Sequence, residues 1–160
     1  MAHQMTEKTT TSTFSIGQFV IITLITSVWV QASEVFRYLV IVRPEMQSYL
    51  SAVPEVASFT LPIFLIWGVW GTLLTGLMVF VFWLCAQSFG NNRQAVVISA
   101  LVSWCFFFLL FWIGMANMQL SSWEFIVWVL PFALMETTVA TFIASALYSK
   151  HSEQGLDTVN

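Results

Sequence analysis

The chain has 160 residues, of which 58% are hydrophobic and only 8% are charged. A soluble domain carries about 25% charged residues, because each surface helix needs a stripe that faces water. Five Lys or Arg and eight Asp or Glu residues cannot supply such stripes, so the composition predicts one integral membrane domain rather than a soluble one. The net charge is −3 and basic residues do not cluster, which excludes nucleic acid as a partner and leaves membrane lipids as the expected surroundings.

Four apolar segments between two polar tails define the predicted fold. Residues 1–13 are polar and rich in threonine, and we expect them to form a disordered tail. The spans that follow are predicted at about residues 14–42, 61–86, 95–116 and 123–147. Each reaches the ~20 residues that a bilayer core requires, and each must be helical because lipid offers backbone groups no hydrogen-bond partners. The sequence therefore predicts an all-α, four-helix transmembrane bundle over residues 14–147, followed by a polar tail over residues 148–160.

The connections between the spans are marked by turn-forming residues. Pro44 and Pro54 interrupt the segment between the first two spans, where residues 45–53 are expected to form a short helix at the membrane interface. Gly90 and the asparagines after it favour a turn between the second and third spans. Residues 117–122 form a short polar loop before the fourth span.

Basic residues near the connections predict the orientation of the bundle, because they collect on the cytoplasmic side of a membrane. With a cytoplasmic N-terminus, Lys8, Arg93 and Lys150 lie inside, whereas Arg37 and Arg43 lie outside. This majority predicts that both termini are cytoplasmic (N-in/C-in), and we expect the membrane to be the inner, or plasma, membrane of a bacterium.

One face of the first span is polar over most of its length. At 100° per residue, its polar side chains fall within an arc of roughly 140°. They are Thr23, Thr26, Ser27, Gln31, Glu34, Arg37 and Tyr38. We expect this stripe to face the bundle interior, a partner subunit or water. Glu34 and Arg37 are spaced so that their side chains can meet, either as a structural ion pair or as the wall of a polar site for a ligand or ion.

Glu136 lies near the middle of the fourth span, which contains no basic residue. An isolated charge at that depth costs about 2.5–3.5 kcal/mol on insertion scales. We therefore expect Glu136 to be protonated, hydrogen-bonded to another helix, or paired with Arg37. It is either a clamp between helices or a functional group that couples a proton or cation, anchors a ligand or takes part in catalysis.

Small residues predict where the helices pack closely, because they let two backbones approach each other. Those predicted for this role are Gly68, Gly71, Thr72 and Gly76 in the second span and Ala133, Thr137 and Ala140 in the fourth. Packing within the chain is favoured over a dimer interface.

Several kinds of catalytic and metal site are absent from the sequence. Both histidines, His3 and His151, lie in the tails, so no span offers imidazole to haem or a metal. The chain has no C-x-x-C, no G-x-S-x-G and no phosphate-binding loop. We expect neither a metal nor a cofactor, and the sequence does not favour an enzyme.

The leading interpretation is a membrane protein that binds or passes a small solute or cation. Its polar site would combine residues of the first and fourth spans, which are Gln31, Glu34, Arg37, Tyr38 and Glu136. The alternative is a non-catalytic accessory or assembly subunit, and a small membrane enzyme comes third. Four helices enclose at most a small pocket, so we also expect a homo-oligomer or a membrane-protein partner.

Overall fold

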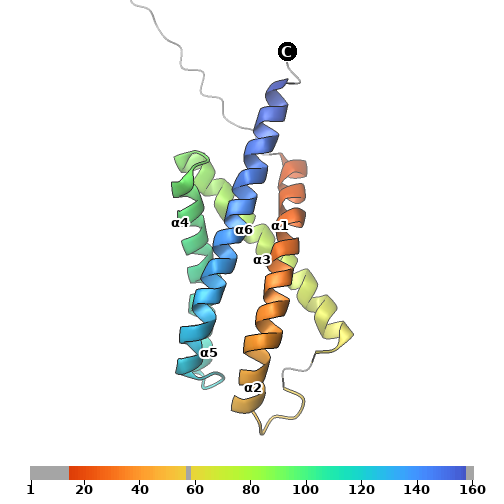
Figure 1. The fold of residues 1–160 in the computed structure, drawn as a ribbon, viewed down its shortest axis with the longest axis vertical. Coiled ribbons are helices and arrows are strands. Elements are labelled where there is room, and N and C mark those ends of the chain that lie inside the picture. Colours follow the sequence, from red (N-terminus) through yellow and green to blue (C-terminus); the bar gives the residue numbers. More distant parts are fainter. Residues whose placement is uncertain (1–14, 57–58, 158–160) are drawn as a thin grey trace, which may run out of the picture.

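The computed structural model describes residues 15–56 and 59–157 of the chain. Within these residues, four helices are long and apolar enough to cross a membrane. The predicted all-α fold with four such helices is therefore confirmed (Figure 1). The predicted disordered tail, residues 1–13, lies outside the described residues.

The first and third of the four long helices each contain one π-helical segment, labelled η. The bounds are α1 Ile16–Arg37, η1 Tyr38–Val42, α2 Arg43–Tyr49, α3 Leu61–Phe89, α4 Arg93–Trp104, η2 Cys105–Leu109, α5 Leu110–Asn117 and α6 Trp123–Asp157. The last helix continues past residue 147, where the fourth span was predicted to end. Side-chain caps begin three of the helices: the Ser15 hydroxyl caps α1, the Asn92 side chain caps α4 and the Ser122 hydroxyl caps α6. Gly90, with a φ of +78°, supplies the turn after α3.

The first helix continues through Pro44 to Tyr49, beyond the predicted end of the first span at residue 42. Proline lacks an N–H and crowds the carbonyl four residues earlier, so it was expected to separate two helices. The π-helical turn η1 lies directly before it, and the N–H of Arg43 donates to the carbonyl of Tyr38. This wider turn redirects the hydrogen bonds upstream of Pro44, and the helix continues.

The four long helices are not parallel, because α3 crosses the others at a steep angle (Figure 1). The end of α3 lies beside the start of α4, while its first turns lie on the far side of α1, away from α5. In chain order, α1 packs on α3, α3 on α4, and α6 on both α4 and α1. The start of α3 therefore protrudes from the bundle, and Ile66 is 72% exposed there.

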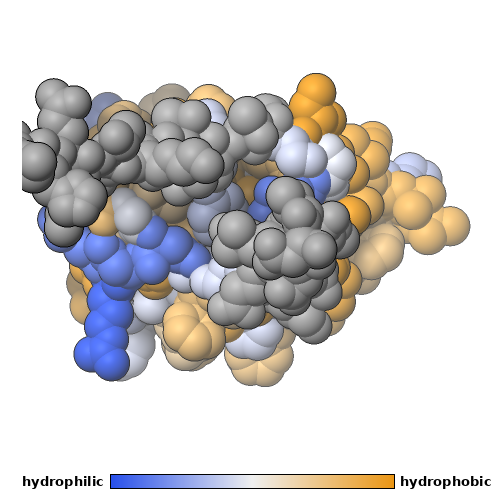
Figure 2. Space-filling view, turned by 90° about the horizontal axis from the view of Figure 1, so that it is seen from above, coloured by the Kyte–Doolittle hydropathy of each residue, from blue (hydrophilic) through white to orange (hydrophobic). Residues whose placement is uncertain are grey.

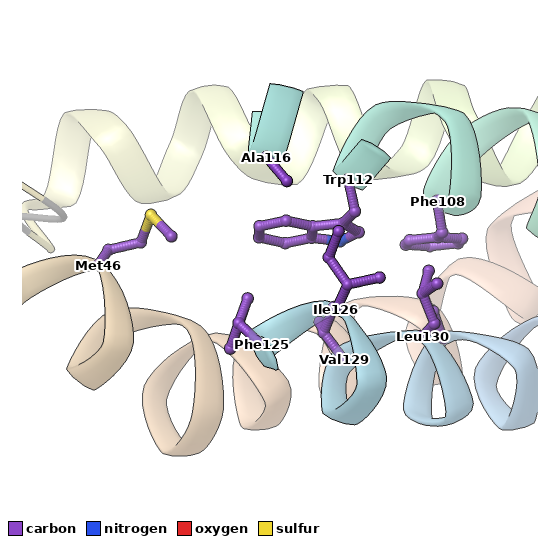
Figure 3. Packing of buried hydrophobic residues seen from close by; sticks show 9 residues of the cluster. Met46, Phe108, Trp112, Ala116, Phe125, Ile126, Val129 and Leu130 are labelled. Atoms are coloured by element: carbon purple, nitrogen blue, oxygen red, sulfur yellow. The ribbon is translucent and has the colours of Figure 1, made fainter. Parts of the chain in front are cut away.

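The largest hydrophobic cluster joins α2, η2 and α5 to the first half of α6 (Figure 3). Its members are Met46, Phe108, Trp112, Ala116, Phe125, Ile126, Val129, Leu130 and Ala133. The rings of Trp112 and Phe125 meet edge to face at 5.1 Å between centroids, a favoured arrangement of two aromatic side chains. The indole N–H of Trp104, which packs against the cluster, donates to the Leu130 carbonyl at 2.9 Å. This cluster fixes η2 and α5 against the first half of α6.

The opposite end of the bundle is held by polar contacts between the α3–α4 turn and α6. Asn91 donates to the Ser149 hydroxyl at 2.6 Å and to the Ser145 carbonyl at 3.1 Å, and accepts from the Ser145 hydroxyl at 2.7 Å. Figure 2 views the molecule from this end, where hydrophilic surface lies beside hydrophobic flanks. The helices are therefore joined by polar contacts at this end, whereas the sides of the bundle are apolar.

Candidate functional site

The polar face of α1 meets Glu136 of α6 inside the bundle. Arg37 donates through Nη2 to Oε1 of Glu34, and its Nε lies 3.6 Å from Oε2 of Glu136. Ser33 donates to the same Oε2 of Glu136 at 2.8 Å. The structure therefore brings Glu136 together with Glu34 and Arg37, about a hundred residues earlier in the sequence, and we call these three residues the charged triad.

The charged triad is buried but not fully satisfied. The side chain of Glu136 is 0% exposed and that of Arg37 is 6% exposed, whereas that of Glu34 is 15% exposed. Among the described residues, neither Oε1 of Glu136 nor Nε of Arg37 has a hydrogen-bond partner. Two carboxyl groups share one guanidinium, so with both ionised the site carries one uncompensated negative charge. A buried charge of this kind is costly and calls for a counter-ion, a proton or a cationic ligand.

A cavity of about 490 Å³ adjoins the charged triad between the first helix, α3 and the η2–α5 segment. Glu34, Arg37 and Tyr38 form its polar wall. The remaining lining is apolar and mostly aromatic: Val30, Val42, Met46, Trp67, Trp70, Gly71, Leu74, Met78, Phe106, Phe107, Phe108, Phe111, Trp112 and Met115. Both the volume and the ratio of apolar to polar groups are those of a small-molecule site.

Aromatic rings surround the polar wall of the cavity. The guanidinium carbon of Arg37 lies 4.9 Å from the centroid of the Phe108 ring. The ring of Tyr38 meets Trp67 edge to face at 4.7 Å between centroids. Aromatic faces attract cations, so this wall already holds one cation, Arg37, and is suited to another.

The comparisons with known proteins, made with family models, with curated proteins and with solved structures, give no match for this chain. A function must therefore be argued from the charged triad and the cavity. Within residues 15–56 and 59–157, no group of three metal-ligating side chains occurs, and the triad itself offers only two carboxyl groups.

The other predicted site residues divide between the cavity and α3. Tyr38 lines the cavity. Gln31 instead turns to α3, where its Nε2 donates to the Gly68 carbonyl at 2.7 Å and to the Thr72 hydroxyl at 3.5 Å. A Cβ added to Gly71 would lie 2.7 Å from this Nε2. Gln31 therefore lies apart from the charged triad and fills the space that a side chain at Gly71 would need.

The residues predicted for close packing occupy different environments. Ala133, Thr137 and Ala140 are almost completely buried inside the bundle. Gly76 faces α1, since an added Cβ would lie 3.6 Å from a methyl carbon of Thr23. A Cβ added to Gly68 would have no neighbouring atom within 4 Å among the described residues.

Two parts of this site were not predicted from the sequence. Ser33 falls outside the polar arc of the first span, yet it is the hydrogen-bond donor to Glu136. The aromatic run at Phe106–Phe108 was not among the predicted site residues, yet all three residues line the cavity. Its only signal in the sequence was the density of aromatic residues at that level of the third span.

Proposed function

We propose that this chain is a membrane protein that binds a small organic cation in the cavity beside the charged triad. The four apolar helices are consistent with a membrane protein. The orientation with both termini cytoplasmic is part of the proposal and rests on the distribution of basic residues. The observation that carries the function is the excess of one carboxyl group over guanidinium groups in the charged triad, two members of which, Glu34 and Arg37, line an aromatic cavity.

The charges favour a cation over an anion or a neutral solute. Arg37 is shared between the carboxyl groups of Glu34 and Glu136, so its positive charge is already balanced within the triad and does not favour an added anion. A cationic ligand beside Glu34 would compensate the excess negative charge. It would also rest on aromatic faces, where a desolvated cation gains about 2 kcal/mol or more.

The shape of the site supports binding as the activity. The cavity reaches Glu34 and Arg37, whereas Glu136 lies behind Arg37 and does not line it. Passage of the same cation across the membrane would need a second opening beyond the charged triad. Glu136 is therefore proposed to set the charge of the site, and Glu34 to contact the ligand.

Binding of benzyltrimethylammonium to the full chain in lipid nanodiscs, measured by isothermal titration calorimetry, tests this proposal. Glu34→Gln removes the excess charge without changing the size of the side chain, and should weaken binding by about tenfold or more, equivalent to about 1.4 kcal/mol. Glu136→Gln should weaken it in the same direction. Glu124→Gln, at an exposed position at the start of α6, is the matched control and should bind like the unmodified chain.

Benzoate and benzyl alcohol serve as the anionic and neutral probes. The proposal expects neither to show binding that depends on Glu34. It is overturned if the Glu34→Gln chain binds the cation as well as the unmodified chain while retaining its helical circular dichroism and its elution volume. It is equally overturned if benzoate binds better than the cation.

A further inference from the structure

We infer that the ligand is an amphiphile with a cationic head and an apolar tail, and that it enters the cavity sideways from the surrounding lipid. This inference rests on the proposed cation site and adds the class of ligand and its route. Three observations carry it: the place of the cavity mouth, the gradient of polarity inside the cavity, and the burial of the charged triad.

The mouth of the cavity lies on the side of the bundle. Trp70 of α3, Phe106 of η2 and Phe111 of α5 all line the cavity and are 59%, 65% and 54% exposed. Lining and exposure together place these three rings at its opening. Phe106 lies near the middle of the Arg93–Asn117 helix, and Trp70 lies well inside α3. An opening at the middle of apolar helices faces the hydrocarbon core of a bilayer, whereas a water-filled entrance would lie at the helix ends.

The tilt of α3 is the cause of this opening. The first turns of α3 diverge from α5 (Figure 1), so the two helices do not close against each other at this level. On the other side, Gln31 holds α3 to α1 through the Gly68 carbonyl. The cavity is thus closed on the side where α3 contacts α1, and it is open on the side between α3 and α5.

Polarity changes in one direction from the mouth to the inner wall. The three rings at the mouth are more than half exposed, whereas Arg37 is 5% exposed and the Glu34 side chain 15% exposed. Flexible apolar side chains, among them Leu74, Met78 and Met115, line the rest of the cavity. Methionine adapts its shape to irregular apolar partners. This order fits a molecule whose charged head lies innermost and whose tail extends through the mouth into lipid.

The burial of the charged triad selects the kind of cation. With Arg37 and Glu136 almost completely enclosed, a strongly hydrated ion would have to lose its water without enough oxygen ligands to replace it. A quaternary ammonium group is weakly hydrated and binds to aromatic faces and one carboxylate. A lone acyl chain could fill the apolar part of the cavity but would leave the charge of the triad uncompensated.

The test uses tetramethylammonium and its butyl-, octyl- and dodecyl-trimethylammonium homologues, with the full chain in nanodiscs. Binding is followed by the fluorescence of the tryptophans in the cavity, and probe concentrations are expressed as mole fractions in the lipid where the probe partitions. The difference in affinity between the unmodified chain and Glu34→Gln measures the contribution of the cationic head group of the probe. We expect this difference to be undetectable for tetramethylammonium and to grow to about tenfold or more for the dodecyl probe.

A second pair of variants tests the mouth. Phe106→Ala removes one of the aromatic rings at the mouth. It should weaken binding of the dodecyl probe by about threefold or more, which is the contribution of a single aromatic contact. Leu110→Ala, which removes an exposed apolar side chain that does not line the cavity, is the matched control and should have no effect.

Three other results would contradict the inference. They also show whether the inference fails alone or together with the proposed function. Equal, Glu34-dependent binding of tetramethylammonium and the dodecyl probe would leave the cation site standing and refute the amphiphile. Equal effects of Phe106→Ala and Leu110→Ala would refute the lateral mouth. If dodecanol binds as tightly as dodecyl-trimethylammonium, with no effect of Glu34→Gln, the cavity holds acyl chains and both proposals fail.

Discussion

The interior of the bundle contains two kinds of buried polar side chain. In the middle of α3 and α6, two buried hydroxyl groups bond to the backbone of their own helix: Thr75 to the Gly71 carbonyl at 2.8 Å and Thr141 to the Thr137 carbonyl at 2.9 Å. At the cavity, Arg37 and Glu136 depend on each other across two helices, and each retains a polar atom without a hydrogen-bond partner among the described residues.

This difference shows that burial of a polar residue is not in itself a sign of function. A hydroxyl that donates to a carbonyl one turn earlier needs no partner on another helix. Thr23, Thr26 and Ser103 have hydroxyl oxygens without a described partner, but a neutral group in this state costs only about 1–3 kcal/mol. A charged group costs more, so an unsatisfied charge is the stronger indication of a missing ligand or proton.

The largest effect on stability is expected from removing the positive charge of the triad. Arg37→Met should lower the free energy of unfolding by about 3–5 kcal/mol, because it leaves two carboxyl groups without their guanidinium. Titration with sodium dodecyl sulfate in mixed micelles measures this change. Arg93→Met, at an exposed position at the start of α4, is the control and should stay within about 0.5 kcal/mol.

A rescue variant shows whether the stability lost in Arg37→Met comes from unpaired charge or from lost packing. Adding Glu34→Gln and Glu136→Gln to Arg37→Met removes the uncompensated charges and should restore most of the lost stability. If the triple variant is no more stable than Arg37→Met alone, the loss comes from the contact between Arg37 and Phe108 rather than from charge.

Ser33→Ala is expected to have the next largest effect. Its hydroxyl is the hydrogen-bond donor to Oε2 of Glu136 at 2.8 Å, and a hydrogen bond to a charged group contributes about 1.5–3 kcal/mol. The same detergent titration measures the loss. In the Glu136→Gln background the loss should shrink to about 1 kcal/mol, the value for a neutral pair. An equal loss in both backgrounds would show that Ser33 does not act through the charge of Glu136.

Gly71→Ala should cost about 1 kcal/mol, because the added methyl group displaces the flexible end of Gln31 and breaks its hydrogen bond to the Gly68 carbonyl. The added Cβ would lie 2.7 Å from Nε2 of Gln31, whereas at Gly68 it would meet nothing within 4 Å. Gly68→Ala is therefore the matched control, and unfolding of the two variants under identical conditions compares them. Combining Gly71→Ala with Gln31→Ala should remove most of the clash; if the double variant gains nothing over Gly71→Ala, the contact with Gln31 is not the cause.

The sequence was sufficient for the four apolar helices because length and hydropathy are local properties. It was also sufficient to place Glu34 beside Arg37, since a regular helix fixes that spacing. It could not provide the cavity, which depends on the tilt of α3 and so on contacts between helices (Figure 1). For the same reason Gln31, on the polar arc, faces α3, while Ser33, outside it, faces Glu136.

The smallest effect is expected from Thr141→Val, and it tests the comparison of the two kinds of buried polar side chain most directly. Valine has nearly the same shape, and the lost hydroxyl bonds only to backbone carbonyls of its own helix, those of Thr137 and Thr138. Those carbonyls lie in the middle of α6 and keep their helical hydrogen bonds. The free energy of unfolding should change by less than about 0.5 kcal/mol, although Thr141 is only 1% exposed. A loss as large as that of Ser33→Ala would mean that a buried hydroxyl bonded within its own helix matters as much as a contact of the charged triad, and that the unsatisfied atoms of the triad do not distinguish the cavity.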